Sequence, residues 1–219
     1  MPSSLQNYLT FFTQFRKRFE TTGAIAPSSP FLAAAMTRYL AARNSSQPAR
    51  ILEIGPGTGP VTNRIIQLLN PHDQLHLVEL NPDFVNTLNQ RFNSEKHWIK
   101  AKPQTTIHQT PLQNYHAEAP FDFIISGLPL NNFPAQLVNE LVDAYFKLLK
   151  PGGTLSYFEY MFVRPVRKRI TRGPEQQRIT QIDQRLAEQC RKTRIHRDNV
   201  WINLPPAWVQ HHQTPPAPQ

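Results

Sequence analysis

Three glycines, Gly55, Gly57 and Gly59, directly follow the short apolar run "RILEI", which carries the carboxylate Glu53. Glycine loses more backbone freedom on folding than any other residue, so such a cluster requires a tight turn or close approach of a ligand to the backbone. The segment "PVTNRIIQLLN" comes next and has helical spacing. This order predicts a strand, a turn and a helix, and the amides of the turn and the helix start favour negative charge.

The alternation of strand and helix continues along the chain. Further strands are predicted at 74–80, 105–110, 121–126 and 154–162, with helices at 60–70, 83–92, 136–150 and 175–192, and one or two late strands within 194–204. Strands that alternate with helices predict an α/β fold with a parallel, doubly wound sheet. Ligands of such sheets bind beyond the carboxyl ends of the strands, where the glycine loop would lie.

Two carboxylates narrow the choice of ligand. Glu79 ends the second predicted strand, 20 residues past Gly59, where a carboxylate accepts the ribose hydroxyls of an adenosine-type cofactor. Pro60 stands where a dinucleotide fingerprint would have its third glycine, and Glu53 is poorly placed against a pyrophosphate. A cationic or amino-acid group suits Glu53 better, and S-adenosylmethionine has both groups and no phosphate.

With these residues the chain resembles the class I methyltransferases, whose E/D-x-G-x-G-x-G motif is matched by Glu53, Gly55, Gly57 and Gly59. The resemblance implies S-adenosylmethionine as cofactor and a Rossmann-like, seven-stranded, mostly parallel sheet. It also implies that the loop binds the methionine moiety and that Glu79 binds the ribose. The other residues that it places at the cofactor are Leu80, Leu112 and Ser126.

The adenine end of this predicted site departs from the family pattern. Class I enzymes often carry an acidic residue after the third strand, whereas the segment "HQTPLQNY" has neither Asp nor Glu. Gln109 or Asn114 would have to substitute for it, together with the backbone of Leu112.

Three stretches outside the core, "GAIAPSSPFLAAAM", "SGLPLNNFP" and "VWINLPPAWV", resemble the bacterial phospholipid N-methyltransferases. That resemblance implies methyl transfer to the amine of phosphatidylethanolamine and of its mono- and dimethyl forms, toward phosphatidylcholine. The related ribosomal RNA adenine dimethyltransferases share the "LEIGPGTG" style of loop, so an RNA adenine N-methyltransferase is the alternative enzyme. A non-catalytic, membrane-associated protein that binds S-adenosylmethionine is the alternative from another class.

The loop after the fourth strand favours lipid over nucleic acid. RNA adenine dimethylases have an aromatic ring in this loop that stacks on the flipped base, whereas this chain has Leu130. The RNA enzymes also usually add a helical C-terminal domain, and little follows the predicted sheet here. We therefore expect a phospholipid substrate and no nucleic-acid partner.

The formal net charge of +9 favours a polyanionic partner, either nucleic acid or an anionic membrane. Residues 1–22 predict an amphipathic helix that interacts with the membrane, because one face carries the apolar residues Leu5, Tyr8, Leu9, Phe12, Phe15 and Phe19. That face would equally serve to pack on the domain. The basic loop 164–172 is the second predicted contact with an anionic membrane, although such charge runs are commonly just solvated.

The acceptor site is predicted from the fifth strand and the basic loop. Arg164, Arg167 and Lys168 are candidates for the lipid phosphate, since guanidinium groups bind phosphate bidentately and the ammonium of lysine binds it as a point charge. Glu159 is a candidate for accepting the proton or attracting the ammonium, although a strand-end carboxylate often just pairs with arginine. Tyr157 is the second catalytic candidate, on the same strand face as Glu159, while Tyr160 faces the other side as a substrate contact.

The remaining expectations concern organisation and location. One cysteine excludes a disulfide framework, and the eight histidines show no spacing typical of metal ligands, so we expect no metal. No apolar run reaches the length of a membrane span. We expect a methyltransferase domain over 23–210, a disordered tail over 211–219, and a cytoplasmic monomer bound peripherally to the inner face of the cytoplasmic membrane.

Overall fold

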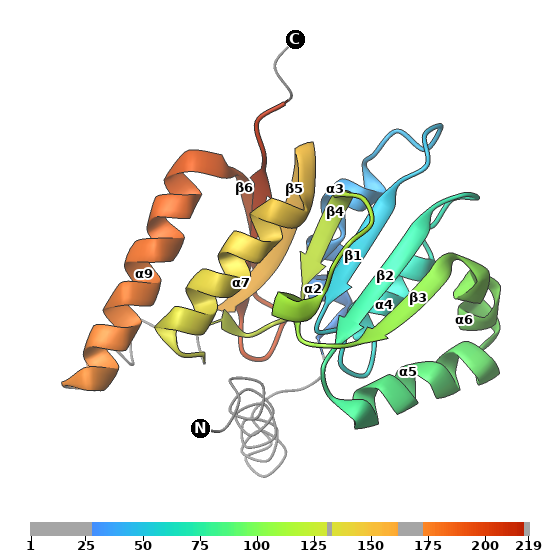
Figure 1. Cartoon of the computed structure of the whole chain (residues 1–219), viewed down its shortest axis with the longest axis horizontal. Coiled ribbons are helices and arrows are strands. Elements are labelled where there is room, and N and C mark those ends of the chain that lie inside the picture. Colours follow the sequence, from blue (N-terminus) through green and yellow to red (C-terminus); the bar gives the residue numbers. More distant parts are fainter. Residues whose placement is uncertain (1–27, 131–132, 162–172, 217–219) are drawn as a thin grey trace.

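The computed structural model describes residues 28–130, 133–161 and 173–216 of the chain. The predicted amphipathic helix and the basic loop 164–172 lie outside the described residues. Within the described part, seven strands form one sheet in the order β3-β2-β1-β4-β5-β7-β6 (Figure 1). Strands β1 to β5 pair in parallel, and β7 is antiparallel to both β5 and β6. The predicted doubly wound, mostly parallel, seven-stranded sheet is confirmed.

Strands β1 to β6 form where apolar or alternating residues predict them, whereas β7 lies beyond the predicted strands. Their bounds are β1 Arg50–Ile54, β2 Gln74–Glu79, β3 Thr105–Gln109, β4 Phe121–Ser126, β5 Leu149–Tyr160, β6 Arg194–Val200 and β7 Ala207–Gln213. The central strands β1 and β4 are the most apolar because helices cover both of their faces. β5 begins earlier than predicted and passes through the "PGG" segment, where its register with β4 shifts.

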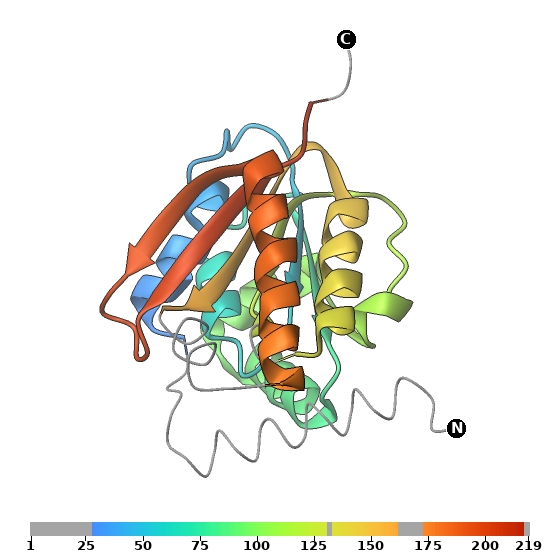
Figure 2. The ribbon, with the colours of Figure 1, turned by 90° about the vertical axis from the view of Figure 1, so that its left-hand side faces the viewer.

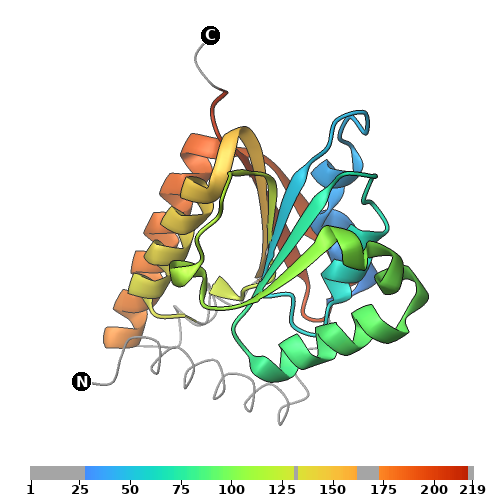
Figure 3. The ribbon, with the colours of Figure 1, turned by 45° about the vertical axis from the view of Figure 1, so that its right-hand side comes forward.

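The helices lie in two layers, one on each face of the sheet (Figures 2 and 3). Their bounds are α2 Pro30–Met36, α3 Arg38–Ala41, α4 Pro60–Ile66, α5 Pro82–Ser94, α6 Lys96–Ala101, α7 Ala135–Leu148 and α9 Pro174–Thr193. Buried apolar side chains of α2, α4, α5 and α6 form one core cluster. Those of α7 and α9 form the other, on the opposite face. None of the helices in the described part of the chain is long and apolar enough to cross a bilayer.

Side-chain caps set where two of these helices begin. The Asn81 side chain accepts a hydrogen bond from the amide of Asp83, and Pro82 occupies the first turn of α5, so the helix begins one residue before the predicted range. Ser29 caps α2 in the same way by accepting from the amide of Leu32. α4 ends at Ile66, four residues before the predicted end, because the chain turns towards β2.

The strand register brings the predicted site to one edge of the sheet. Ile54, at the end of β1, pairs with Val78 on one side and with Ser126 on the other. Ser126 in turn pairs with Tyr157 of β5. The loops that leave β1, β2, β4 and β5 therefore meet at one edge, where doubly wound sheets bind ligands.

The end of the chain differs from the expectation. Residues 211–213 belong to β7, so they are not part of the disordered tail that we predicted from residue 211. His211 and His212 are buried, and their Nδ1 atoms lie 2.8 Å from Ser156 Oγ and 2.9 Å from Thr193 Oγ1. The apolar start of "AWVQHHQ" was the missed signal, because the two adjacent histidines suggested exposure to solvent rather than a strand that is buried on both faces.

Burial of His212 predicts a stability cost in acid. Burial, followed by the nearby Arg194 charge, lowers the pKa of His212 to about 4, against an ordinary value near 6.5. Below pH 6.5 His212 binds a proton in the unfolded chain but stays neutral in the folded chain, so the folded state loses stability as the pH falls to about 4. The stability advantage of the wild type over a His212→Gln variant should shrink across this range, by at most about 3 kcal/mol. Urea unfolding at several pH values measures it, and a constant difference would contradict the assignment.

Candidate functional site

The glycine loop between β1 and α4 is shaped by three positive φ angles, 67° at Gly55, 59° at Gly57 and 85° at Gly59. A Cβ atom at Gly55 would lie 2.5 Å from Leu128, and one at Gly59 would lie 2.4 Å from the Trp98 ring. A Cβ atom at Gly57 would meet nothing within 4 Å. The outer two glycines are thus required by the packing of the fold, and Gly57 leaves open space in front of the loop.

Glu79 ties this loop to the start of α5. Its Oε2 accepts a hydrogen bond from the Gly57 amide at 3.0 Å, and its Oε1 accepts one from the Asn81 amide at 2.8 Å. The carboxyl group is buried, and this burial raises the pKa of Glu79 although the backbone hydrogen bonds act in the opposite direction. A buried acceptor therefore stands at the end of β2, where the sequence predicted it.

Glu53 lies deeper, beneath the loop. Its Oε2 accepts a hydrogen bond from Thr62 Oγ1 at 2.6 Å, which joins β1 to the first turn of α4. Burial, reinforced by the charge of Glu79, raises the pKa of Glu53 to about 8. The group is therefore largely protonated at neutral pH, and a cation placed against it would favour its ionisation.

An apolar pocket opens beside these carboxylates, between the ends of β1 and β2 and the segment after β3. It brings together four residues predicted for the cofactor, Gly55, Glu79, Leu80 and Leu112. Its lining consists of Ile54, Gly55, Val78, Glu79, Leu80, Thr110, Pro111, Leu112, Gln113, Leu128, Leu137 and Leu141. The planar base of a nucleoside fits such a lining, and the hydroxyls of its ribose fit the carboxylate at the pocket's edge.

The polar residues at the far side of this pocket differ from those predicted. Thr110 and Gln113 line it, whereas Gln109 and Asn114 are exposed to solvent. Gln109 is the last residue of β3 and pairs with Glu79, and a short 3₁₀ turn at Leu112–Asn114 directs the following residues. The sequence gives no periodic signal for such a short turn, so the register of this segment was not predictable.

Ser126 is brought to the same edge but does not line the pocket. It is buried, its Oγ lies 2.8 Å from the hydroxyl of Tyr145, and it accepts a hydrogen bond from the Leu128 amide at 3.3 Å. In the loop that follows, a Cβ atom at Gly127 would lie 2.7 Å from the carbonyl oxygen of Gly55. Ser126 and Gly127 thus hold the loop after β4 against the glycine loop.

The residues of β5 that we predicted for the acceptor site lie on both faces of the sheet, as the alternation along the strand predicted. Tyr157 packs in the cluster under α7 and α9, with its ring stacked on His212 at 5.4 Å. Tyr160 packs on the other face, where burial raises its pKa to about 12. Glu159 is buried and accepts a hydrogen bond from Gln210 at 3.4 Å. These three residues end β5 beside the β4 loop, but none lines the apolar pocket.

Two further observations bear on the acceptor. Leu130 and Phe133, which flank the undescribed residues 131–132, are both buried in the cluster under α7. Leu130 is therefore a core residue. Within the described ranges, no three metal-ligating side chains gather into a group that could hold an ion.

Known proteins of similar sequence are methyltransferases. Residues 51–153 match a family profile described as a methyltransferase domain. The ornithine lipid N-methyltransferase of Singulisphaera acidiphila is 29% identical over 157 residues, which cover 72% of this chain and 80% of that protein. The ribosomal RNA small subunit methyltransferase A of Pseudomonas fluorescens is 30% identical over 146 residues, which cover 65% of this chain and 47% of that protein.

Solved structures share the fold. An O-methyltransferase from Bacillus cereus, in complex with S-adenosyl-L-homocysteine, superposes with a TM-score of 0.63 at 16% identity over 94% of this chain and 91% of its own. The N-methyltransferase NodS of Bradyrhizobium japonicum, also in complex with S-adenosyl-L-homocysteine, gives 0.56 at 19% identity over 85% and 89%. With the strand order and the glycine loop, the profile match over residues 51–153 identifies a methyltransferase domain with the class I fold, for which S-adenosylmethionine is the methyl donor.

Proposed function

We propose that this enzyme transfers methyl groups to the amine of a membrane lipid, with phosphatidylethanolamine and its mono- and dimethyl forms as acceptors. The main support for a lipid amine as the acceptor is the match to an ornithine lipid N-methyltransferase across 80% of that protein. Ornithine lipid is therefore the second candidate acceptor. The chain spans only about half of the RNA methyltransferase that it matches, which gives RNA less support.

The proposed cofactor site uses the groups that surround the glycine loop. Glu79 accepts the ribose hydroxyls, and the apolar residues Leu80 and Leu112 contact the adenine. The open space at Gly57 admits the methionine moiety, and Glu53 faces its cationic groups. The buried carboxylates, the apolar pocket and the open glycine fit a cofactor that combines an aromatic base, a diol and a positive charge.

Methyl transfer requires a neutral amine at the acceptor. When bound, the cofactor would supply an electrophilic methyl group on a sulfonium; its transfer to the nitrogen would leave a neutral thioether and release one proton from the amine. A lipid amine titrates near lysine, with a pKa of about 10.4, so most of it is protonated at neutral pH. We propose that Glu159 attracts this ammonium or accepts its proton, and that Tyr157 supports Glu159 from the same strand face. Exclusion of water and alignment of the amine supply further rate.

The remaining contacts of the proposal concern the membrane. Tyr160 would contact the substrate from the other face of β5, and Arg164, Arg167 and Lys168 would bind the lipid phosphate. The face formed by residues 5–19 and the basic loop 164–172 would bind the anionic inner surface of the cytoplasmic membrane, with the protein as a monomer. The net charge of +9 supports attraction to such a surface.

The acceptor is tested by supplying labelled S-adenosylmethionine with three acceptors in parallel. These are phosphatidylethanolamine vesicles with anionic lipid, ornithine lipid vesicles with the same anionic lipid, and structured ribosomal RNA. We expect label in mono-, di- and trimethylated phosphatidylethanolamine. Label in ornithine lipid alone would make that lipid the acceptor, and label in RNA alone would overturn the lipid proposal. Cofactor binding without any transfer would favour a non-catalytic protein.

Because the space in front of Gly57 is open, we expect a side chain introduced there to weaken cofactor binding without a matching effect on the fold. Gly57 and Gly152 both have positive φ angles, 59° and 76°, and a Cβ atom at either would meet nothing within 4 Å. Alanine at either position should therefore cost a similar amount of stability, about 1 kcal/mol. Only Gly57→Ala should weaken S-adenosylmethionine binding, by roughly tenfold or more, since Gly152 lies near the start of β5, at the opposite end of the strand from the glycine loop. Calorimetric titration measures both, and equal affinities would remove the cofactor from the loop.

The raised pKa of Glu53 predicts that cofactor binding releases a proton. The free carboxyl, with a pKa of about 8, is largely neutral at pH 7, and a cationic cofactor group would ionise it. Affinity should therefore rise by roughly tenfold between pH 6 and 7 and level off above about pH 8. Titrations in buffers of different ionisation enthalpy measure the released proton. Glu53→Gln keeps an acceptor for Thr62 but should abolish the release; unchanged release in that variant would contradict the assignment.

A further inference from the structure

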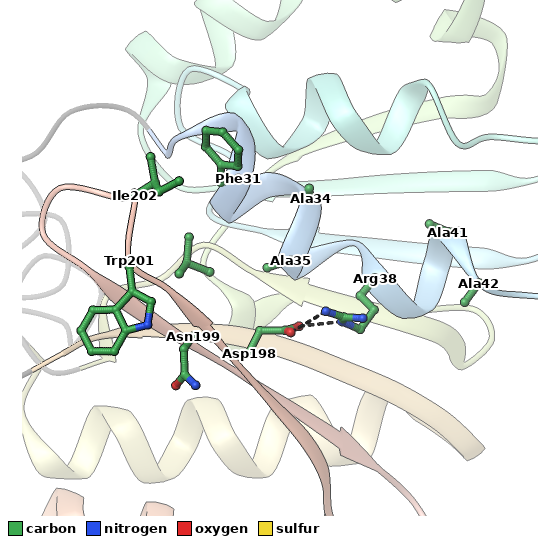
Figure 4. A pocket seen from close by; sticks show the side chains of 11 residues that line it. Phe31, Ala34, Ala35, Arg38, Ala41, Ala42, Asp198, Asn199, Trp201 and Ile202 are labelled. Atoms are coloured by element: carbon green, nitrogen blue, oxygen red, sulfur yellow. Dashed lines mark hydrogen bonds and ion pairs between the residues drawn. The ribbon is translucent and has the colours of Figure 1, made fainter.

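The largest exposed apolar side chains of the described residues gather at one place. Trp201, Ile202 and Leu204, in the turn between β6 and β7, are 62%, 69% and 74% exposed, and Phe31 at the start of α2 is 56% exposed. We call these four residues the hairpin-tip patch. Phe31, Trp201 and Ile202 also line a shallow groove whose floor includes Ala34 and Ala35 (Figure 4).

Hydrogen bonds hold the turn so that these side chains point outward. Asn203 is buried within the turn; its Oδ1 accepts from the Ser29 amide at 3.1 Å, and its Nδ2 donates to the carbonyl of Pro205 at 2.8 Å. The turn is thereby attached to the N-terminus of α2. The patch is a fixed surface, and its exposure is not the result of a loose loop.

The patch lies at the same edge of the sheet as the cofactor site. Ala207, directly after the turn, pairs with Tyr160 at the carboxyl end of β5, and the Pro206 carbonyl accepts a hydrogen bond from the Met161 amide at 2.8 Å. Ile195, at 43% exposure, lies at the opposite end of the same hairpin, where Arg194 pairs with His212. The apolar exposure is thus concentrated at the end where an acceptor would arrive.

The segments that form the patch carry no charge that would repel an anionic surface. Residues 199–210 carry no charged side chain, and neither do residues 28–37, in a chain with a net charge of +9. The acidic group at the inner end of the groove, Asp198, is paired with Arg38, whose Nε lies 2.7 Å from Oδ2 (Figure 4). An anionic surface that covers the tip would therefore meet apolar atoms and no unpaired carboxylate.

We infer that the hairpin-tip patch inserts into the interface of the lipid bilayer and presents the cofactor edge to the membrane. This inference rests on the proposal that the acceptor is a membrane lipid. Tryptophan suits the boundary between headgroups and acyl chains, and bulky aliphatic side chains gain free energy as they leave water. The pinned turn places these groups at the membrane without any rearrangement of the sheet.

Tryptophan quenching by brominated lipid tests the inserted position directly. Full-length protein is mixed with phosphatidylethanolamine vesicles that contain phosphatidylglycerol and bromine-labelled acyl chains. We expect quenching in the wild type and its loss in Trp201→Phe, which retains an apolar ring at the tip. Trp98 is fully buried in the core and Trp208 is partly buried, and both are present in the variant, so the difference between the two proteins reports on Trp201. Binding to vesicles without quenching at Trp201 would overturn the inference and leave the lipid acceptor intact.

A matched pair of double variants tests the contribution to binding. Ile202→Ser with Leu204→Ser removes two side chains of the patch, and Ile99→Ser with Ile195→Ser removes two exposed isoleucines away from it. The first should lower vesicle partitioning and methyl transfer on vesicles by roughly tenfold or more, and the second should change neither. Transfer to detergent-dispersed lipid should be equal in both. Equal partitioning of the two variants would overturn the inference.

Two other occupants of the patch give distinct results. If residues 1–27 or a second copy of the chain cover it, Trp201 will be shielded from acrylamide in the absence of vesicles, which would overturn the inference. Failure of the proposed function gives another result, because the wild-type enzyme would then methylate neither lipid. Protein that binds vesicles but labels only RNA would likewise contradict the lipid acceptor.

Discussion

The carboxylate of Glu79 joins the glycine loop to the start of α5, and the shape of the cofactor edge, the edge of the sheet where the cofactor site lies, depends on this connection. One oxygen holds the Gly57 amide of the glycine loop, and the other holds the Asn81 amide at the start of α5. The geometry of the loop, the opening at Gly57 and the side of the pocket formed by Leu80 all follow from these two bonds. Because the group is buried, its hydrogen bonds are costly to leave unmade, and the edge is correspondingly well defined.

Much of this arrangement could be predicted from the sequence, since it follows from local patterns. Apolar runs marked the parallel strands, and the spacing of Glu53, the glycines and Glu79 marked the cofactor edge. Leu80 and Leu112, which the resemblance assigns to the cofactor, line the pocket, and their contact with the cofactor stays a prediction. These features depend on residues close together in the chain or at the ends of adjacent strands.

The features that were not predicted depend on contacts between distant segments. Trp98 packs behind Gly59, although nothing near either residue indicates that contact. The choice of Thr110 and Gln113 over Gln109 and Asn114 depends on one short 3₁₀ turn. His211 and His212 pair with β5 and face opposite sides of the sheet, where Tyr39 packs on His211 and Thr193 of α9 contacts His212. Ser126 supports a loop because the hydroxyl of Tyr145 on α7 reaches its own hydroxyl.

Methyltransferases that share this kind of cofactor site act on many different acceptors, so the residues around the site must select the acceptor. The matched proteins illustrate this, because their names describe methylation of an ornithine lipid and of ribosomal RNA. In this chain the surroundings include a buried Leu130, the carboxylate of Glu159 and a pinned apolar turn on the same side of the sheet. An apolar edge of this kind is better suited to a bilayer than to a nucleic acid, which is bound mainly through its phosphates.

A crystal structure of the protein with S-adenosyl-L-homocysteine tests the central claim most directly. We predict that the ribose hydroxyls lie within hydrogen-bonding distance of Glu79 and that the adenine lies against Leu80 and Leu112. The amino-acid end should extend over Gly57 towards Glu53. A ligand bound elsewhere, with Glu79 still bonded only to the backbone amides of Gly57 and Asn81, would contradict the account.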